Sequence, residues 1–194
     1  MQPEGVDTLR LEIIIGSTRV GRVAPHVAEW FAEQAREHGA FDIGVLDLAD
    51  YALPVDLDED AVPVDFRERI AAADAFVVVT PEYNHGYPAA LKLALDSLKS
   101  EWRTKSTGFV SYGGPGGGIR AVEQLRQVVV ELHMTSVRQA VHLPRIRKAL
   151  ADNGTLRDRI ADPIALDAAP RMLSQLQWWA SATKQWGSVA PYPG

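Results

Sequence analysis

Residues 75–88 read AFVVVTPEYNHGYP, and this stretch gives the clearest indication of the fold. Its first part, 75–80, is a continuous run of apolar and β-branched residues, which is typical of a strand buried on both faces of a parallel sheet. Its second part, 81–88, contains two prolines, a glycine and an asparagine, which are turn residues. The next stretch, 88–99, places Leu91, Leu95 and Leu98 on one face of a predicted helix. Strand, loop and helix in this order predict one unit of an α/β fold.

The same order recurs on both sides of this unit. We predict four more strands at 9–15, 41–48, 107–112 and 134–143, helices at 23–38, 62–73, 119–132 and 167–186, and a loop at 152–154. Right-handed crossovers leave few arrangements for five parallel strands. We expect a three-layer, flavodoxin-like sandwich with sheet order 2-1-3-4-5 and helices on both faces. Nothing resembles a linker, so we predict a single domain over residues 1–194.

Composition narrows the class of protein. The chain has 194 residues, a net charge of -5 and no cysteine, which excludes disulfides, thiolate metal sites and a cysteine nucleophile. The acidic balance argues against a nucleic-acid partner. No apolar run reaches the roughly 20 residues of a membrane span, and the N-terminal segment lacks the cationic start of a signal peptide. We therefore expect a cytoplasmic protein with no membrane partner.

Three unusual loops follow the first, third and fourth predicted strands: GSTRVGR at 16–22, PEYNHGYP at 81–88 and SYGGPGGG at 111–118. In an open α/β sheet of this order, ligands bind beyond the carboxyl ends of the strands, where the winding direction reverses. We therefore expect the three loops to line one site.

The first loop joins a strand to the start of a helix, where free backbone N–H groups and the helix dipole attract an anion. Gly16 permits a tight turn, Ser17 and Thr18 add hydroxyl donors, and Arg19 and Arg22 add charged donors. A phosphate monoester matches this set. The alternative is that Ser17 caps the helix and both arginines are solvated.

The second loop offers a flat tyrosine ring at Tyr83 and both a donor and an acceptor at Asn84, as the edge of a heterocycle requires. The alternative is a plain turn in which 84–86 make the bend and Pro88 begins the helix. We interpret His85 as a loop residue. Glycines of the third loop let the backbone approach a ring or a phosphate closely, although an exposed flexible turn has the same composition.

Other chemistries have little support. The five histidines show no metal-ligand spacing, and no nucleophile elbow is present. The acidic run at 56–60 lacks the glycine and the final glutamate of a calcium loop, so we interpret it as a solvated loop. We predict no metal site and no side chain that acts as acid, base or nucleophile.

GSTRVGR, PEYNHGYPAALKLALD and SYGGPGGGIRAVEQLR together resemble the NADPH-dependent FMN reductase family, which includes quinone, azo-dye and chromate reductases. The resemblance spans residues 9–143 and implies a flavodoxin-like fold, non-covalent FMN and NADPH as the reductant. Two positions depart from the family pattern: Leu93 replaces a frequent asparagine, and Ser106 follows Lys105 where a proline is usual.

By position, the resemblance implies the contacts of the cofactor. The FMN phosphate would lie on Ser17, Thr18, Arg19 and Arg22. The ring would lie against Pro81, Glu82, Tyr83 and Asn84, with Ser111, Tyr112 and Gly113 on its other side. The resemblance also implies a homodimer or homotetramer. We expect some of Trp178, Trp179 and Trp186 in the last helix at a subunit contact.

The resemblance implies an oxidoreductase that takes a hydride from NADPH and passes electrons to a quinone, an azo compound, a metal oxyanion or free flavin. A flavin performs such chemistry without a side-chain acid or nucleophile. A non-enzymatic FMN electron carrier or redox sensor with protein partners is the alternative, because the fold supports both. The two arginines and the mostly neutral glycine loop favour the enzyme, since carriers of this fold tend to be acidic around the flavin. A third hypothesis is a phosphate-binding protein that holds no flavin.

Overall fold

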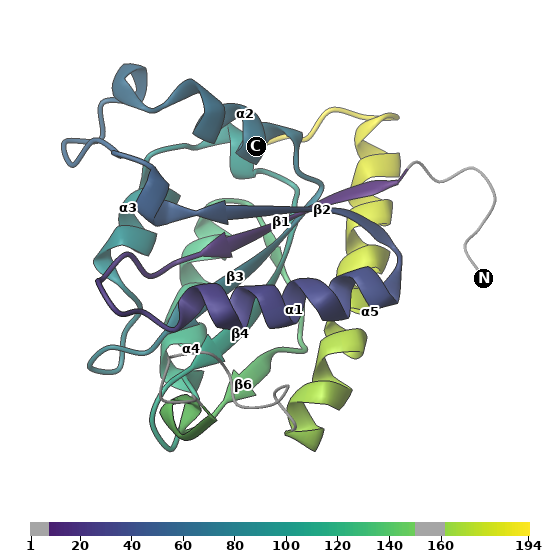
Figure 1. The fold of residues 1–194 in the computed structure, drawn as a ribbon. Coiled ribbons are helices and arrows are strands. Elements are labelled where there is room, and N and C mark those ends of the chain that lie inside the picture. Colours follow the sequence, from purple (N-terminus) through teal and green to yellow (C-terminus); the bar gives the residue numbers. More distant parts are fainter. Residues whose placement is uncertain (1–7, 150–161) are drawn as a thin grey trace.

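A computed structural model describes residues 8–149 and 162–194. Its centre is a parallel sheet with helices on both faces (Figure 1). The strands are β1 (Leu9–Ile15), β2 (Phe41–Asp47), β3 (Ala75–Pro81), β4 (Ser106–Tyr112), β5 (Thr135–Ser136) and β6 (Val141–Leu143). They follow the order β2-β1-β3-β4-β5, and β6 also pairs with β4. The predicted flavodoxin-like sandwich is confirmed.

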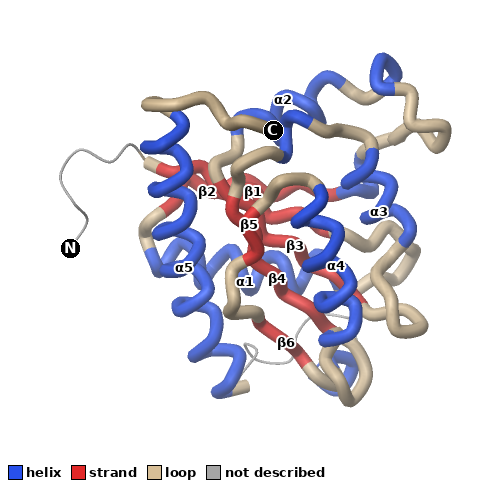
Figure 2. Tube along the Cα trace, turned by 180° about the vertical axis from the view of Figure 1, so that it is seen from behind, coloured by secondary structure: helices blue, strands red, loops and turns tan. Residues whose placement is uncertain are grey.

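Within residues 8–149 and 162–194, five α-helices complete the three layers: α1 (Ala24–His38), α2 (Val64–Ala72), α3 (Ala89–Asp96), α4 (Ile119–Glu131) and α5 (Pro163–Gly187). Helices α1 and α5 pack against one face of the sheet and share one hydrophobic core. Helices α2, α3 and α4 cover the other face and form a second core (Figure 2). No helix in the described part of the chain is both long and apolar enough to cross a bilayer.

Strand β3 lies at the centre of the sheet, between β1 and β4. All seven of its residues are buried, as its continuous apolar sequence predicts. Val77 and Val79 face the core of α1 and α5, while Phe76 and Val78 face the opposite core. The segment after β3 therefore leaves the sheet at its middle, which places residues 81–88 between the other two loops.

The fifth strand differs from its prediction. We predicted one strand over 134–143, but the structure has two short strands, β5 and β6, separated by residues 137–140. The guanidinium of Arg126 donates to the carbonyl oxygens of Val137 (2.7 Å) and Arg138 (3.1 Å), and the Gln139 N–H donates to Oε1 of Gln175 (2.9 Å). Side chains thus satisfy backbone groups that a continuous strand would pair with its neighbour.

Helix α5 begins at Pro163, earlier than the predicted 167, because Asp162 caps it. The Asp162 carboxylate accepts from the N–H groups of Ile164 (2.9 Å) and Ala165 (3.3 Å). Helix α3 ends at Asp96, short of the predicted 99, and a 3-10 turn follows at Ser100–Trp102. The loop predicted at 152–154 lies outside the described residues.

Candidate functional site

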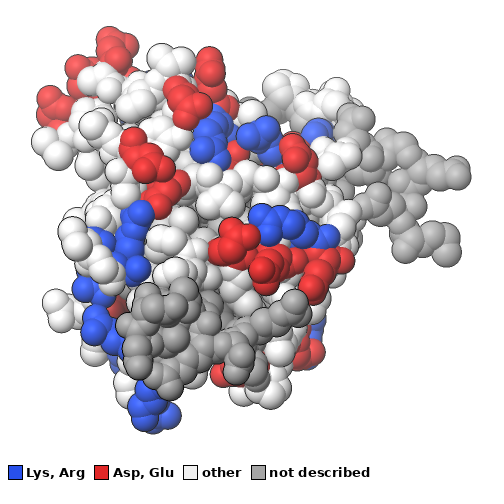
Figure 3. Space-filling model, viewed as in Figure 1, with Lys and Arg blue, Asp and Glu red and all other residues white. Residues whose placement is uncertain are grey.

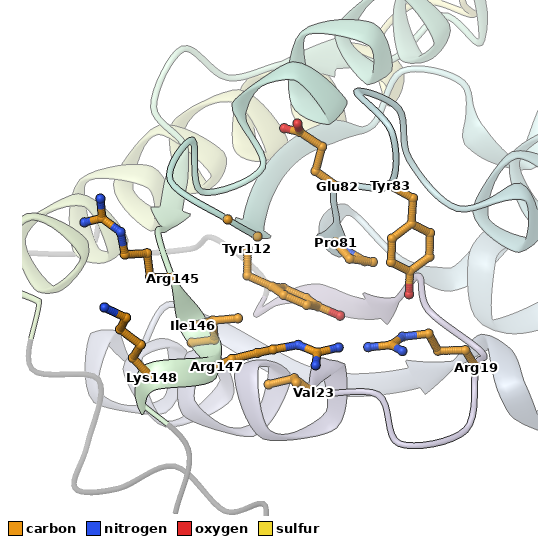
Figure 4. Close-up of a pocket in the computed structure, with 12 residues that line it drawn as sticks. Arg19, Val23, Pro81, Glu82, Tyr83, Tyr112, Arg145, Ile146, Arg147 and Lys148 are labelled. Carbon is orange, nitrogen blue, oxygen red and sulfur yellow. The ribbon is translucent and has the colours of Figure 1, made fainter.

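The loops after β1, β3 and β4 meet around one cavity of about 710 Å³ (Figure 4). This volume is in the usual range for a cofactor or small-molecule site. Six of the predicted site residues line it: Arg19, Pro81, Glu82, Tyr83, Tyr112 and Gly113. The structure therefore brings together the three loops that the topology rule placed at one sheet edge.

The first loop enters α1 without a side-chain cap. The N-cap residue is Val23, and the first turn contains no acidic residue. Ser17 does not cap the helix; it is buried, and its hydroxyl lies 3.0 Å from that of Tyr83. Gly16 lies tight against β3, with its N–H donating to the Val79 carbonyl oxygen (2.9 Å). The positive end of the α1 dipole thus faces the loop without a protein anion in the helix's first turn.

The two arginines of this loop have different surroundings. Arg19 lines the cavity, and its guanidinium carbon is 5.9 Å from the ring centre of Tyr83. Arg22 instead forms an ion pair with Asp47, at the end of β2, and donates to the Ser17 carbonyl oxygen (2.7 Å). Thr18 lines a separate hollow of about 280 Å³. Of the charged and hydroxyl side chains in this loop, Arg19 is the one that faces the cavity.

The second loop begins with a tight turn. Tyr83 and Gly86 exchange two backbone hydrogen bonds of 2.8 and 2.9 Å, and the central residues Asn84 and His85 have φ values of 48° and 70°. This is the pattern of a two-residue hairpin turn, with the bend at residues 84–85. Tyr83 lines the cavity, while Asn84 is exposed and does not line it.

Glu82 is held by the start of α4. Its carboxylate accepts from Nε of Arg120 (2.6 Å) and from the Arg120 backbone N–H (3.2 Å). Figure 4 shows this carboxylate turned away from the side of the cavity where Arg19 lies. The charge of Glu82 is therefore paired, and it does not oppose an anion bound near Arg19.

The third loop rests on the buried Ser111 and the partly buried His142. Ser111 lies under it, with its hydroxyl 2.8 Å from the Gly117 carbonyl oxygen and 2.7 Å from Nδ1 of His142. Burial lowers the pKa of the His142 imidazole, and nearby Arg126 lowers it further. Gly118 has a φ of 89°, and a Cβ there would lie 2.7 Å from Cβ of Ser111. The loop thus depends on a glycine at 118.

Tyr112 projects from the end of β4 into the cavity (Figure 4). Burial raises the pKa of its phenol well above the usual value, and the neighbouring Tyr83 raises it further. The hydroxyl therefore stays protonated at neutral pH and can donate a hydrogen bond. Together with Pro81 and Tyr83, Tyr112 gives the cavity an apolar and aromatic wall.

Sequence reasoning missed one wall of the cavity. This wall is formed by Arg145, Ile146, Arg147 and Lys148. These residues come one position after the end of β6, from which Pro144 separates them. The signal was present, because RIRK places three cations immediately after the last strand, at the same sheet edge as the other loops. We refer to residues 145–148 as the basic turn.

Charge is unevenly distributed over the face shown in Figure 3. Acidic side chains gather at its upper left, where Figure 1 places the chain between β2 and α2. The predicted acidic run at 56–60 lies in that segment and is exposed. Basic side chains lie along the left edge, toward which β1 and β2 point. On this face, basic side chains therefore lie along the left edge below the acidic segment.

Comparison with known proteins identifies the chain. The family model described as NADPH-dependent FMN reductase matches residues 9–148, which include all three loops and the basic turn. The chain belongs to the NADPH-dependent FMN reductase family. The resemblance drawn from the three motifs is confirmed, and the protein is an NAD(P)H-dependent reductase with FMN as its cofactor.

Relatives of the reductase agree with this assignment. An NAD(P)H-dependent FMN reductase of Schizosaccharomyces pombe is 39% identical over 152 residues, which cover 71% of this chain and 75% of the relative. A 2-hydroxy-1,4-benzoquinone reductase of a Burkholderia species is 32% identical, with 66% and 69% covered. The FerB NAD(P)H:(acceptor) oxidoreductase of Paracoccus denitrificans shares the fold, with a TM-score of 0.67, 20% identity, and 88% and 98% covered.

The two departures from the family pattern lie away from the cavity of the reductase. Leu93 lines the smaller hollow beside Thr18. Ser106 begins β4, and its buried hydroxyl donates to the Leu176 carbonyl oxygen (3.2 Å) in α5. The serine thus ties the sheet to α5, a bond that a proline could not form.

Proposed function

We propose that the reductase binds FMN in the 710 Å³ cavity, where the bound cofactor would supply hydride transfer from NADPH to a small acceptor. The acceptor is a quinone, an azo compound, a metal oxyanion or free flavin. One observation carries this proposal: a cation, an uncapped helix start and two tyrosines, drawn from three separate loops, surround a single cavity. This set suits a ligand with a phosphate at one end and a flat ring at the other.

The phosphate of FMN would lie at the first loop. Arg19 is its charged donor, and the backbone N–H groups of residues 17–22 and the dipole of α1 add to the attraction. The hydroxyls of Ser17 and Thr18 belong to the same loop. Arg22 would act by fixing the loop, because its guanidinium is bonded to Asp47 and to the Ser17 carbonyl oxygen.

The ring of FMN would lie along the aromatic wall. Pro81, Tyr83 and Tyr112 supply apolar surface, and the protonated Tyr112 hydroxyl is a donor. Asn84 is exposed in the turn that follows Tyr83, and its amide would offer both a donor and an acceptor to the edge of the ring. Glu82 and Gly113 line the cavity and would lie beside the ring, with the Glu82 carboxylate held by Arg120. Ser111 would support the ring from behind, because it is buried under the glycine loop.

The chain needs no acid or nucleophile for this reaction. With a quinone, NADPH, one proton and the quinone become NADP⁺ and a hydroquinone, so that two electrons and two protons reach the acceptor. The protein binds and orients the reactants and excludes competing reactions. The Ser111–His142 pair does not make the site a hydrolase, because Ser111 is completely buried under the glycine loop.

The test is NADPH oxidation by the purified, FMN-loaded protein with 1,4-benzoquinone as the only acceptor. We expect rapid turnover without any added protein. Arg19→Gln should raise the Kd for FMN about tenfold or more, because it removes a charged hydrogen-bond donor. Arg36→Gln is the control, since Arg36 pairs with Glu29 on the surface of α1. Turnover that requires a second protein would favour the electron-carrier alternative.

We further propose that the reductase is a homodimer or homotetramer that acts in the cytoplasm. The side chains of Trp178, Trp179 and Trp186 on α5 are 63%, 40% and 68% exposed. Exposed indole rings of this size favour a protein contact. A sequence without cysteine suits a reducing compartment. Light scattering coupled to gel filtration tests the assembly, and Trp178→Ser with Trp186→Ser should shift the protein toward the monomer.

A further inference from the structure

Cationic side chains stand at two ends of the cavity. Figure 4 shows Arg19 at one end and Arg145 and Lys148 at the other, with Arg147 between them. The guanidinium groups of Arg147 and Arg19 point toward one another across the cavity. Guanidinium groups repel at close range, so this arrangement suits an anion held between them. Arg145 and Lys148 lie away from that point, where a second anionic group has room.

The basic turn is firmly attached to the fold. Ile146 is only 5% exposed and belongs to the core shared with α1 and α5. The Arg145 N–H donates to the Gly114 carbonyl oxygen (2.9 Å), and the Lys148 N–H donates to the Arg145 carbonyl oxygen (2.9 Å). The turn is thus tied to the glycine loop by its backbone, while Arg145, Arg147 and Lys148 remain exposed at the cavity.

Arg145 also has an uncommon backbone conformation, with a φ of 51°. A non-glycine residue in this left-handed region is strained by about 1–3 kcal/mol, and such residues concentrate at ligand sites. Glycine would relieve the strain at this position. The position instead carries a long cationic side chain that lines the cavity, which points to a role in binding.

We propose that Arg145 and Lys148 bind the 2′-phosphate of NADPH and so make the reductase select NADPH over NADH. This inference rests on the proposed function. If the flavin phosphate lies near Arg19 and the ring lies along Tyr83 and Tyr112, a nicotinamide on that ring places the rest of the donor toward the opposite end of the cavity. A phosphate monoester carries close to two negative charges, which suits two neighbouring exposed cations. NADH has a hydroxyl at that position.

The experiment compares nucleotide binding by two double variants of the FMN-loaded protein. Arg145→Gln with Lys148→Gln removes both cations, and calorimetry measures the Kd for NADP⁺ and for NAD⁺. We expect the Kd for NADP⁺ to rise about 10- to 100-fold, with the Kd for NAD⁺ and the FMN content unchanged. Arg145→Lys with Lys148→Arg keeps both charges and should preserve the preference for NADP⁺.

The matched control removes two positive charges elsewhere. Arg36→Gln with Lys99→Gln changes exposed side chains that pair with Glu29 and Glu59, respectively. NADP⁺ binding should be unchanged in this control. An equal loss there would show that overall charge is responsible and would overturn the proposal.

Other outcomes would also overturn the proposal. If the Kd values for NADP⁺ and NAD⁺ rose equally, the two cations would contact a group that both nucleotides contain. Loss of FMN from the glutamine variant would assign the cations to the flavin. In both cases the proposed function stands. A wild-type protein that binds neither FMN nor nucleotide would instead overturn the proposed function itself.

Discussion

Arg22 and Asp47 form a bidentate ion pair that joins the first loop to the end of β2. Nη1 of Arg22 lies 2.8 Å from Oδ1 of Asp47, and Nη2 lies 2.5 Å from Oδ2. Nη1 also donates to the Ser17 carbonyl oxygen at 2.7 Å. Both side chains are 18% exposed, so solvent screens this pair less than an ordinary surface pair. The pair holds the loop in shape from behind, while Arg19 faces the cavity.

The first prediction concerns how Arg22 contributes to FMN binding. Asp47→Ala should raise the Kd for FMN about tenfold, although Asp47 is an anion, because the loop loses its attachment. Arg22→Ala should have a similar effect. The double variant should be no worse than either single variant, because the two residues act as one unit. Flavin fluorescence titration measures all three constants.

Asp42→Ala is the matched control for this prediction, since Asp42 is an exposed carboxylate on the same strand, at 4.0 Å from Arg10. FMN binding should be unaffected in this variant. If Arg22 contacted the phosphate directly, Asp47→Ala would free its guanidinium and tighten binding. That result would refute the positioning role.

Asn84 has two separable roles in the second loop. Its φ of 48° strains most residues, whereas glycine adopts it freely. Asn84→Ala should therefore lower the free energy of unfolding by about 1 kcal/mol, and Asn84→Gly should leave it nearly unchanged. Both variants lose the amide, so both should weaken FMN binding and alter the visible spectrum of the flavin. His85→Gly, which changes the same turn but keeps the amide, should bind FMN normally. Normal FMN binding by Asn84→Gly would show that the Asn84 amide does not contact the flavin.

Gly118 is predicted to be the most sensitive glycine of the third loop. An added Cβ would lie 2.7 Å from Cβ and 2.9 Å from Oγ of Ser111, at a φ of 89°. Gly118→Ala should lower the free energy of unfolding by at least about 2 kcal/mol. At Gly114 a Cβ meets nothing within 4 Å, so Gly114→Ala should be neutral or slightly stabilising. Chemical denaturation compares the two, and equal stability of both variants would show that the loop adapts.

The buried ammonium of Lys105 should make the free energy of unfolding depend on pH. Its ammonium donates to the carbonyl oxygens of Ile70 (2.6 Å) and Ala71 (2.7 Å), and burial lowers its pKa from the usual 10.5 to about 8. Between these two values the unfolded chain binds more protons than the folded protein, so the free energy of unfolding rises with pH, by at most about 1.4 kcal/mol per unit. Burial of the charged ammonium lowers the free energy of unfolding by its full amount below pH 8. This loss disappears above pH 10.5, the pKa of the lysine in the unfolded chain.

The measurement for Lys105 is the stability difference between wild type and Lys105→Met at pH 7.5 and at pH 9.5. Methionine has a similar length and no titrating group, so this difference isolates the lysine. The free energy of unfolding of the wild type should increase relative to that of the variant as the pH rises. A difference that stays constant would mean that the Lys105 ammonium keeps its ordinary pKa.

Much of the fold was predictable because its signals are local. The continuous apolar run at β3 matches a strand with all seven residues buried, and the turn residues after it lie at the sheet edge. The break between β5 and β6 was not predictable. It depends on Arg126, whose guanidinium reaches Val137 from a different element, and an apolar pattern does not encode such a contact.

The site was predictable in part for a similar reason. The rule for strand ends located the three loops, and applied to the last strand it would also have located the basic turn. Arg19 and Arg22 look equivalent in the sequence, yet they lie in different surroundings. Asp47, which engages Arg22, belongs to another strand, so only the folded structure separates the two arginines.

The visible absorption spectrum of the purified protein, recorded before and after anaerobic addition of NADPH, tests both FMN binding and the reduction of the flavin by NADPH. We expect a flavin spectrum, either as purified or after adding FMN, that bleaches promptly with NADPH. Arg19→Gln should show lower flavin occupancy under the same conditions. A colourless protein that does not take up added FMN would contradict the assignment of the cavity, and a flavin spectrum unchanged by NADPH would contradict the reductase reaction.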